Sequence, residues 1–185
     1  MSHGPEYNEV EFPLIEQLNL MGWQHQVGDI HVPALTERES FKQTLLEGRL
    51  REAVRRINAP LYPWLDDSHV SEAVSQLTRL PTGVMGLLPV NAHLTGLLLD
   101  GVQVTGPDGK GHTVRFIDFR NLDRNDFLAI NQFRVDPPGY VAGKGYIIPD
   151  VVLFVNGIPL VVVECKAPNV TSPMEHAVND LLGYQ

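Results

Sequence analysis

Cysteine is almost missing from this chain of 185 residues, which contains only one. A single cysteine excludes an internal disulfide and is typical of proteins of the reducing cytoplasm, where we expect this protein to act. No apolar run approaches the roughly 20 residues of a membrane-spanning helix, and no charged-then-apolar signal peptide begins the chain. We therefore expect no membrane partner.

Two kinds of ligand-binding motif are also missing. The seven histidines are scattered along the chain, so no zinc site is expected. There is no GxxxxGK(S/T) phosphate loop, and the segment Gly143-Lys144-Gly145-Tyr146 does not meet its spacing. The chain itself therefore carries no sign of ATP binding.

Positive charge is scarce as well. The chain has 14 Lys and Arg residues against 22 Asp and Glu residues, which gives a net charge of −8. A protein that grips nucleic-acid phosphates by itself usually presents a basic face, so this balance argues against autonomous DNA binding. The one basic cluster consists of Arg49, Arg51, Arg55 and Arg56. If the chain acts on DNA, another component must hold the DNA.

The most informative segment present is PDVVLFVNGIPLVVVECK, where Pro149-Asp150 and Glu164-Cys165-Lys166 enclose two apolar runs. Strands so rich in Val, Ile, Leu and Phe are normally buried. Asp, Glu and Lys are almost never fully buried unless they are paired or bind a ligand. Charge on such strands therefore needs a partner, and a divalent cation is the best candidate.

The geometry of this segment depends on its turn. Asn156-Gly157 between the apolar runs predicts a hairpin with strands over 151–155 and 160–166. An uninterrupted two-residue loop would pair residue 150 with 163 and separate the acids. A three-residue loop, or one bulge, would pair 150 with 164. We expect this second register, because Gly157 can supply the left-handed residue of a bulged turn.

In that register the Cβ atoms of Asp150 and Glu164 would lie about 5 Å apart, and two carboxylates at that distance repel by roughly 3 kcal/mol at an effective dielectric of ~20. Mg²⁺ would offset this, bound by Asp150, Glu164, the backbone carbonyl of Cys165 and water. Such a site polarises a phosphoryl oxygen, and Lys166 would orient or activate water or stabilise the transition state. The alternative is a strand-end turn and a surface ion pair. The short spacer and the apolar flanks favour the metal site.

The rest of the chain predicts further elements in one domain spanning 1–185, since this length and 43% hydrophobic residues suffice for a sizeable core. The predicted elements are helices over 8–21, 36–57 and 70–80, a hairpin over 102–105 and 112–119, a strand over 127–135, and a helix opening at Ser172. The 36–57 helix rests on the capping box Thr36-Glu37-Arg38-Glu39. A loop over 137–145 precedes the Asp150 strand, a placement that often borders active sites.

Four segments together resemble a known family. They are LIEQLNLMGW, GVQV, FIDFRNLDRNDFLAINQF and PDVVLFVNGIPLVVVECKAP, and they are similar to the N-terminal nuclease domain of the restriction (R) subunit of type I restriction-modification enzymes. The resemblance covers nearly the whole chain. It implies the restriction-endonuclease-like, PD-(D/E)xK fold, an α/β architecture with a mixed central sheet of about five strands flanked by helices.

The resemblance also implies residue roles. Asp150 and Glu164 match the metal-binding acids of the family, and Lys166 matches its catalytic lysine. A glutamate of the N-terminal helix corresponds to Glu11 or to Glu9, and the resemblance does not decide between them.

One element departs from the family pattern. The family has a Q-x-x-x-Y element after the ExK strand, and Tyr184 matches its tyrosine. Asp180 stands in the place of the glutamine. An acid that faced the scissile phosphate would repel it unless it helped to hold a cation, so the role of this element is in question here.

The assembly that the resemblance implies is larger than this chain. It contains helicase-like domains that use ATP to translocate double-stranded DNA, with modification and specificity subunits that supply sequence recognition. We therefore expect an N-terminal fragment of a motor subunit that cleaves DNA with Mg²⁺, and ATP binding only in domains absent from this chain. The alternatives are a stand-alone or methyl-directed nuclease of the same fold, and a catalytically silent scaffold module.

Overall fold

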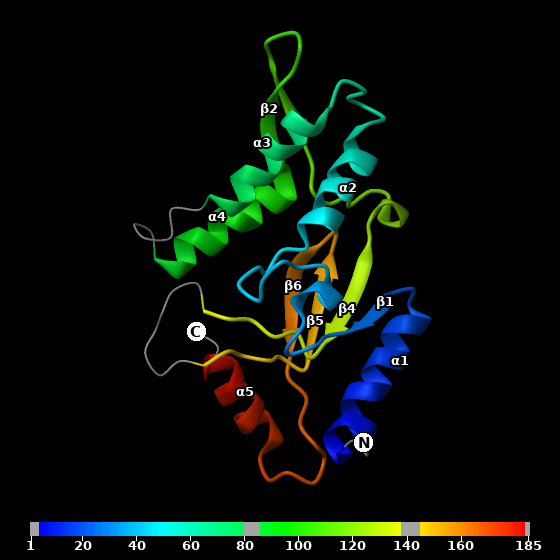
Figure 1. The fold of residues 1–185 in the computed structure, drawn as a ribbon, viewed down its shortest axis with the longest axis vertical. Coiled ribbons are helices and arrows are strands. Elements are labelled where there is room, and N and C mark those ends of the chain that lie inside the picture. The colour runs from blue at the N-terminus through cyan, green and yellow to red at the C-terminus, as the bar shows by residue number, and fades with distance from the viewer. Residues whose placement is uncertain (1–3, 80–85, 138–144, 184–185) are drawn as a thin grey trace. The chain divides into compact units, whose positions relative to one another are not determined.

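The structure is a computed structural model that describes residues 4–79, 86–137 and 145–183, apart from the side chain of Leu87. The chain divides into two compact units, one formed by Met1–Leu46 with Phe127–Gln185 and the other by Glu47–Asp126. The first unit contains a four-stranded sheet, and the second contains a separate two-stranded sheet (Figure 1). Tyr184, which we expect to be the tyrosine of the Q-x-x-x-Y element, lies outside the described residues.

The first unit is built on a mixed sheet with the strand order β1-β4-β5-β6. β1 (Gln24–Val27) is parallel to β4 (Phe127–Asn131), and β4, β5 (Val151–Val155) and β6 (Ile158–Val163) are antiparallel in turn. The helical segments are η1 (Tyr7–Glu11), α1 (Phe12–Leu20), η2 (Pro33–Thr36) and α5 (Pro173–Gly183). The predicted α/β class with a mixed sheet is confirmed. The described residues form four strands in that sheet rather than about five.

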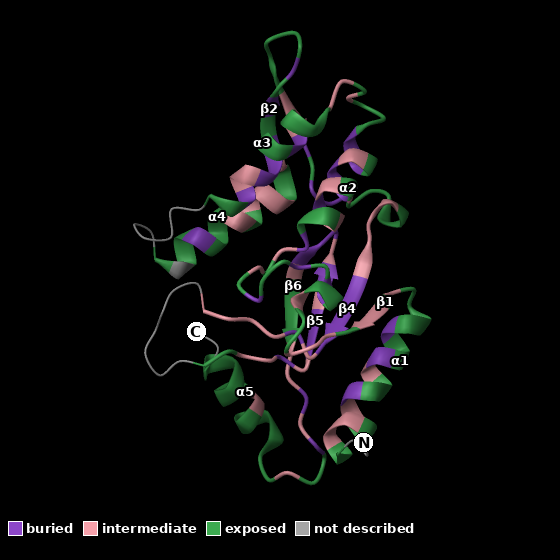
Figure 2. Ribbon diagram, viewed as in Figure 1, coloured by how far each residue is buried: buried purple, intermediate pink, exposed green. Residues whose placement is uncertain are grey.

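Apolar side chains cover both faces of this sheet, because neighbouring residues of a strand point to opposite sides. One face is filled by Leu46, Leu128, Ile130, Phe133, Val152 and Phe154. The other face packs against α1 and contains Ile15, Leu18, Ala129 and Val151. β4 and β5 are therefore the buried centre of the unit (Figure 2). Polar residues at the ends of these two strands are held in a rigid frame.

The β5–β6 hairpin has a two-residue turn and a bulge. Asn156 and Gly157 both have positive φ, 54° and 77°, which is the conformation that a tight two-residue turn requires. Phe154 pairs with Pro159, whereas Leu153 pairs with Val161, so one additional residue is inserted in β6. The bulge shifts the pairing by one position, as the expected register requires, although the turn itself is not the bulged one that was predicted.

The second unit combines three helices with a hairpin. The helices are α2 (Glu47–Asn58), α3 (Asp67–Thr78) and α4 (Leu87–Asp100), and β2 (Val102–Thr105) pairs with β3 (Gly111–Val114). A short helix, η3, covers Leu122–Arg124. Asp66 caps α3 by accepting hydrogen bonds from the backbone N–H groups of Ser68 and His69. This cap starts α3 three residues before the predicted start at residue 70.

The arginines of α2 are engaged within the second unit. Arg49 forms an ion pair with Asp126 at 2.7 Å, and Arg55 pairs with Asp67. Arg51 donates to the hydroxyl of Ser71, and the Nε of Arg56 donates to the carbonyl of Arg124. The basic cluster noted in the sequence therefore has internal partners, which reduces the positive charge that it can offer to a polyanion.

The predicted helix over 36–57 is wrong in its first half. Thr36 ends η2, and Glu37 has a left-handed backbone with φ 59°, so the capping box does not form. The reason is tertiary. Arg38 is buried, its guanidinium lies 3.7 Å from the ring centroid of Phe133, and it donates to the carbonyls of Gln43 and Arg134. These contacts outweigh a local helix preference, and α2 begins only at Glu47.

Several strand and helix boundaries also differ from the expectation. β1 and α4 have no predicted counterpart, because the first is short and polar and the second contains Pro89 and Gly96 within an apolar run without clear periodicity. The strand predicted over 127–135 ends at Asn131, because Gln132 has φ 56° and leaves the extended conformation. The strands predicted over 112–119 and 160–166 end at Val114 and Val163.

Gly28 is required where β1 leaves the sheet. Its N–H donates to the carbonyl of Asn131, and a Cβ there would meet the carbonyl oxygens of Gln132 and, at 2.7 Å, of Asn131. Gly28→Ala should therefore destabilise the fold by roughly 2 kcal/mol. Gly96→Ala, in the interior of α4 with open space around it, should stabilise by about 0.5–1 kcal/mol. Thermal unfolding of both variants checks this, and equal effects would contradict the close approach.

Candidate active site

Asp150 is held at the open end of the hairpin. It directly precedes β5, and because Val151 pairs with Val163, Asp150 lies opposite Glu164. Its Oδ2 accepts a hydrogen bond of 2.6 Å from the N–H of Cys165, and its own carbonyl accepts one from the N–H of Gln132. Neighbouring segments therefore fix both the backbone and the carboxylate.

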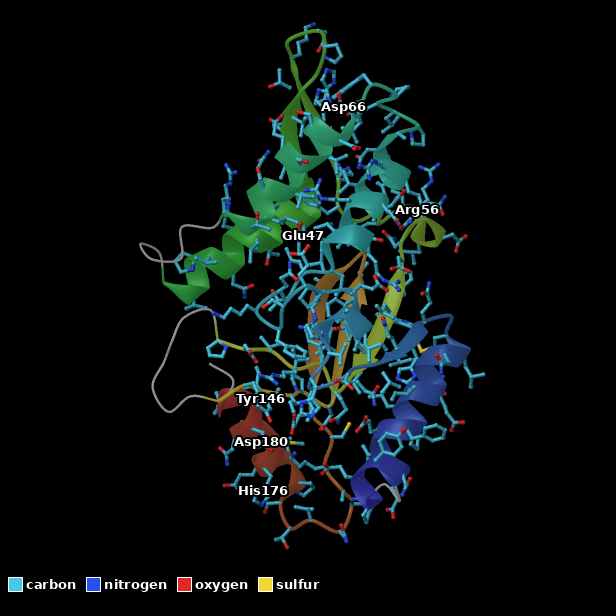
Figure 3. All side chains as sticks on the ribbon, in the orientation of Figure 1. Glu47, Arg56, Asp66, Tyr146, His176 and Asp180 are labelled. Carbon is cyan, nitrogen blue, oxygen red and sulfur yellow. The ribbon has the colours of Figure 1, made fainter. Side chains whose placement is uncertain are left out.

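Lys166 lies between two carboxylates. Its Nζ is 2.7 Å from Oε1 of Glu164 and 2.9 Å from Oδ2 of Asp180, which comes from α5 (Figure 3). The side chains of Glu164 and Lys166 are only 7% and 16% exposed. Burial acts to lower the pKa of Lys166, but the hydrogen bonds with Glu164 and Asp180 raise it above its ordinary value. Lys166 is therefore a firmly protonated ammonium.

Two glutamates from the start of the chain meet the same hairpin end. Glu11 is buried, with 3% of its surface exposed, and its Oε1 accepts a hydrogen bond of 2.9 Å from Nδ2 of Asn131. Oε2 of Glu6 accepts one of 3.2 Å from the N–H of Ala167. Glu9 is exposed. Of the two glutamates that the sequence left open, the structure brings Glu11 to the hairpin.

Pro13 explains the local geometry of Glu11. Proline lacks an N–H, and its ring crowds the carbonyl four residues earlier, so a regular helical turn is disfavoured there. The preceding turn is widened into the π-helical segment η1, and the N–H of Phe12 bonds to the carbonyl of Tyr7. π-Helical turns often mark functional sites. Here the widened turn ends on the buried Glu11.

The acids at this end of the hairpin repel one another. Burial and, to a smaller extent, the charges of Glu164, Glu11 and Glu6 together raise the pKa of Asp150 to about 6, against the lowering effect of the Cys165 N–H. Burial and the same four acids raise the pKa of the Cys165 thiol to about 12, so that thiol is not a nucleophile. A cation bound among these carboxylates would remove much of the repulsion.

The donor set suits a hard cation that keeps water ligands. Among the described residues, no three Asp, Glu, His or Cys side chains are arranged closely enough to hold a metal ion by themselves. Mg²⁺ does not need such a cage, because it is commonly bound through one or two carboxylates, with water and substrate oxygens completing its coordination. Asp150 and Glu164, with the backbone carbonyl of Cys165 between them in the chain, fit that pattern.

Three residues of this region were not foreseen from the sequence. Glu6 lies at the beginning of the N-terminal helical segment. The only hint in the sequence is that several glutamates follow one another there. Asn131 is buried at the end of β4, and His25 in β1 lies within hydrogen-bond distance of it. A polar residue closing an apolar strand, as Asn131 does, was the available signal. His25 had none, because β1 itself was not predicted.

The α/β architecture with a mixed sheet and the acid-lysine cluster at a hairpin end agree with the restriction-endonuclease-like fold. The family described as Type I restriction enzyme R protein N terminus matches residues 6–185. Because that match covers nearly the whole sequence, the chain belongs to this family.

Individual relatives agree with the family match. A protein of Haemophilus influenzae named Type I restriction enzyme HindI endonuclease subunit is 34% identical over 166 residues, which are 87% of this chain and 15% of the relative. A protein of Methanocaldococcus jannaschii named Putative type I restriction enzyme MjaIXP endonuclease subunit is 30% identical over 174 residues, 92% of this chain and 16% of the relative. The chain therefore spans about one sixth of the length of these relatives. None of the helices that the described residues form is long and apolar enough to cross a membrane.

The raised pKa of Asp150 predicts how stability depends on pH. The folded state keeps this proton up to about pH 6, whereas the unfolded chain releases it near its ordinary pKa of 3.8. The protonated carboxyl therefore stabilises the fold below about pH 4, and this contribution is lost as the pH rises through about 6. Asp150→Asn, which stays neutral, should stabilise the metal-free protein at about pH 8 by on the order of 1 kcal/mol, a value reduced for partial exposure.

Thermal unfolding at acid and alkaline pH measures this effect. Asp29→Asn is the matched control, because backbone hydrogen bonds from His31 and Val32 lower the pKa of Asp29 instead of raising it. This control should not stabilise the protein. A lower melting temperature for Asp150→Asn than for the unchanged protein at alkaline pH would contradict the repulsion argument.

The ion pair of Asp180 should hold α5 in place. No described residue of α5 is buried, so few apolar contacts secure the helix (Figure 2). A pair with one half-exposed partner is weak, so Asp180→Ala should raise the opening equilibrium of α5 by no more than roughly fivefold. Hydrogen exchange over 173–183 measures this. Asn179→Ala, an exposed neighbour, is the control, and equal exchange in both variants would show that the pair does not secure the helix.

Proposed function

We propose that this chain is the Mg²⁺-dependent endonuclease domain of a type I restriction enzyme R subunit, and that it hydrolyses phosphodiester bonds of double-stranded DNA. The observation that carries the proposal is the juxtaposition at the hairpin end. Asp150 lies opposite Glu164, and the ammonium of Lys166 contacts Glu164. Membership of the R-subunit N-terminal family and the names of the relatives support it.

The acids would bind the cation. Asp150, Glu164 and the backbone carbonyl of Cys165 are the protein ligands that we assign to Mg²⁺, and Glu11 is a further acid whose charge acts on Asp150. Bound there, Mg²⁺ supplies a Lewis acid that polarises a phosphoryl oxygen and lowers the pKa of a water. The N–H of Cys165 fixes the orientation of the Asp150 carboxylate, so this ligand is positioned before the cation arrives.

Lys166 is suited to charge stabilisation rather than to proton abstraction. Its hydrogen bonds to Glu164 and Asp180 keep it protonated, and an ammonium cannot accept a proton from water. It can donate a hydrogen bond to a phosphoryl oxygen, where negative charge accumulates in the transition state. Asp180 would then orient the side chain of Lys166 and would not contact the phosphate itself. Tyr184 remains a further candidate for the site on the family pattern alone.

DNA would be held mainly by other parts of an assembly. The net charge of −8 opposes a polyanion, and the arginines of α2 have internal partners. This chain matches only about one sixth of the length of its relatives. We assign ATP-driven motor domains to other parts of the same subunit. We assign sequence recognition to modification and specificity subunits, and we place the assembly in the cytoplasm.

Separation of cleavage from translocation tests the proposal. In the R subunit assembled with its partner subunits, Asp150→Ala, Glu164→Ala and Lys166→Ala should each lower the DNA cleavage rate at least about a hundredfold, as loss of a transition-state donor or metal ligand does. ATP hydrolysis should be unchanged, because these side chains serve the scissile phosphate only.

Lys42→Ala is the matched control for the lysine, because Lys42 is exposed in the same unit. It should leave cleavage unchanged. Retained cleavage in the Asp150 and Glu164 variants would refute the assigned site, and simultaneous loss of ATP hydrolysis in folded protein would refute the separation of the two activities.

A further inference from the structure

A chain of hydrogen bonds leads from β1 to the buried acid of the N-terminal helix. Nε2 of His25 lies 3.0 Å from Oδ1 of Asn131, and Nδ2 of Asn131 lies 2.9 Å from Oε1 of Glu11. The three residues come from β1, from the end of β4 and from η1, which are distant in sequence. His25 and Asn131 lie in adjacent strands, because His25 pairs with Ala129.

The direction of these hydrogen bonds follows from the chemistry of the groups. An ionised carboxylate can only accept, so the amide of Asn131 must present its NH₂ group to Glu11. Its carbonyl oxygen then faces His25, and the imidazole must carry a proton on Nε2 in order to donate. Each member therefore determines the orientation of the next, and the amide cannot turn over without losing both bonds.

The backbone of Asn131 is fixed as firmly as its side chain. Its carbonyl accepts the N–H of Gly28, and the next residue, Gln132, bends away with φ 56° and donates its N–H to the carbonyl of Asp150. The residue that holds Glu11 is therefore one peptide from the residue that holds Asp150. A substitution at Asn131 would therefore alter the positions of both Glu11 and Asp150.

This arrangement is costly for stability alone. Burying a carboxylate and an amide is unfavourable even when they are hydrogen-bonded, and an apolar pair of the same shape would usually serve the fold as well. The charge of Glu11 in addition repels Asp150. A buried acid that is oriented by a rigid amide and repels a second acid is an arrangement suited to a cation that both acids share.

We propose that Asn131 and His25 are positioning residues that hold the carboxylate of Glu11 toward the cation site of Asp150 and Glu164. Neither residue contacts the cation or DNA, and both act through Glu11. This inference rests on the proposed function, because it presupposes a divalent cation at the hairpin end.

Mn²⁺ titration of the chain tests the inference without a cleavage assay, with free Mn²⁺ followed by its electron paramagnetic resonance signal. Asn131→Ala should weaken Mn²⁺ binding roughly tenfold, the effect typical of losing a group that orients a metal ligand. His25→Ala should weaken it by a smaller factor. His25→Gln should restore affinity to within about twofold of the unchanged protein, because its amide can donate to Oδ1 of Asn131. His93→Ala, an exposed histidine of α4, is the control and should have no effect.

A double-variant cycle separates positioning from a general structural role. Glu11→Gln alone should weaken Mn²⁺ binding, and adding Asn131→Ala to it should change affinity by less than about twofold, because the acid on which Asn131 acts is already neutral. Circular dichroism monitors folding of each variant. If Asn131→Ala does not fold, the comparison of His25→Ala with His25→Gln decides the question.

Three results would overturn the inference. They are unchanged affinity in folded Asn131→Ala, an equal loss in both Glu11 backgrounds, and no recovery in His25→Gln. Failure of the proposed function looks different, because the unchanged protein and Asp150→Ala would then bind Mn²⁺ equally weakly, and the inference would fall with it.

Discussion

The bulge in β6 is the constraint on which the rest of the site depends. Side chains alternate along a strand, so a shift of one residue moves each charge to the other face. Because Leu153 pairs with Val161 while Phe154 pairs with Pro159, Asp150 lies opposite Glu164. Without the additional residue, Asp150 would lie opposite Val163, and the acids would point to different sides of the sheet. The N–H of Cys165 then reaches the Asp150 carboxylate, and the hairpin end becomes a site.

The same site works against the stability of the fold. Glu6, Glu11 and Glu164 interact electrostatically with Asp150 at one strand end, and burial together with this repulsion raises the pKa of Asp150. The apolar packing on both faces of β4 and β5 offsets this electrostatic repulsion. Lys166 offsets only part of the negative charge, since it also pairs with Asp180. Strongly shifted pKa values such as that of Asp150 are found preferentially at functional sites.

Sequence patterns predicted the hairpin, the mixed α/β class and the grouping of Asp150, Glu164 and Lys166, because these depend on alternation and turn chemistry within one short segment. They failed where distant contacts overrule local preference. The segment at Thr36 has the pattern of a helix start, yet the buried Arg38 is drawn to Phe133 and to the carbonyl of Arg134. No local sequence pattern predicts such a contact, because its partners are about a hundred residues apart in the chain.

The sequence by itself determined that acids and a lysine would be presented together on one strand pair, because the periodicity of a strand and the reach of a two-residue turn are local properties. Only the tertiary structure decided which further groups join them. Glu11 ends the helical turn that is widened before Pro13 and is buried against Asn131, whereas Glu9 is exposed. His25 reaches Asn131 because β1 pairs with β4 across about a hundred residues of chain. Such choices depend on how separate elements pack, and packing is a property of the whole unit.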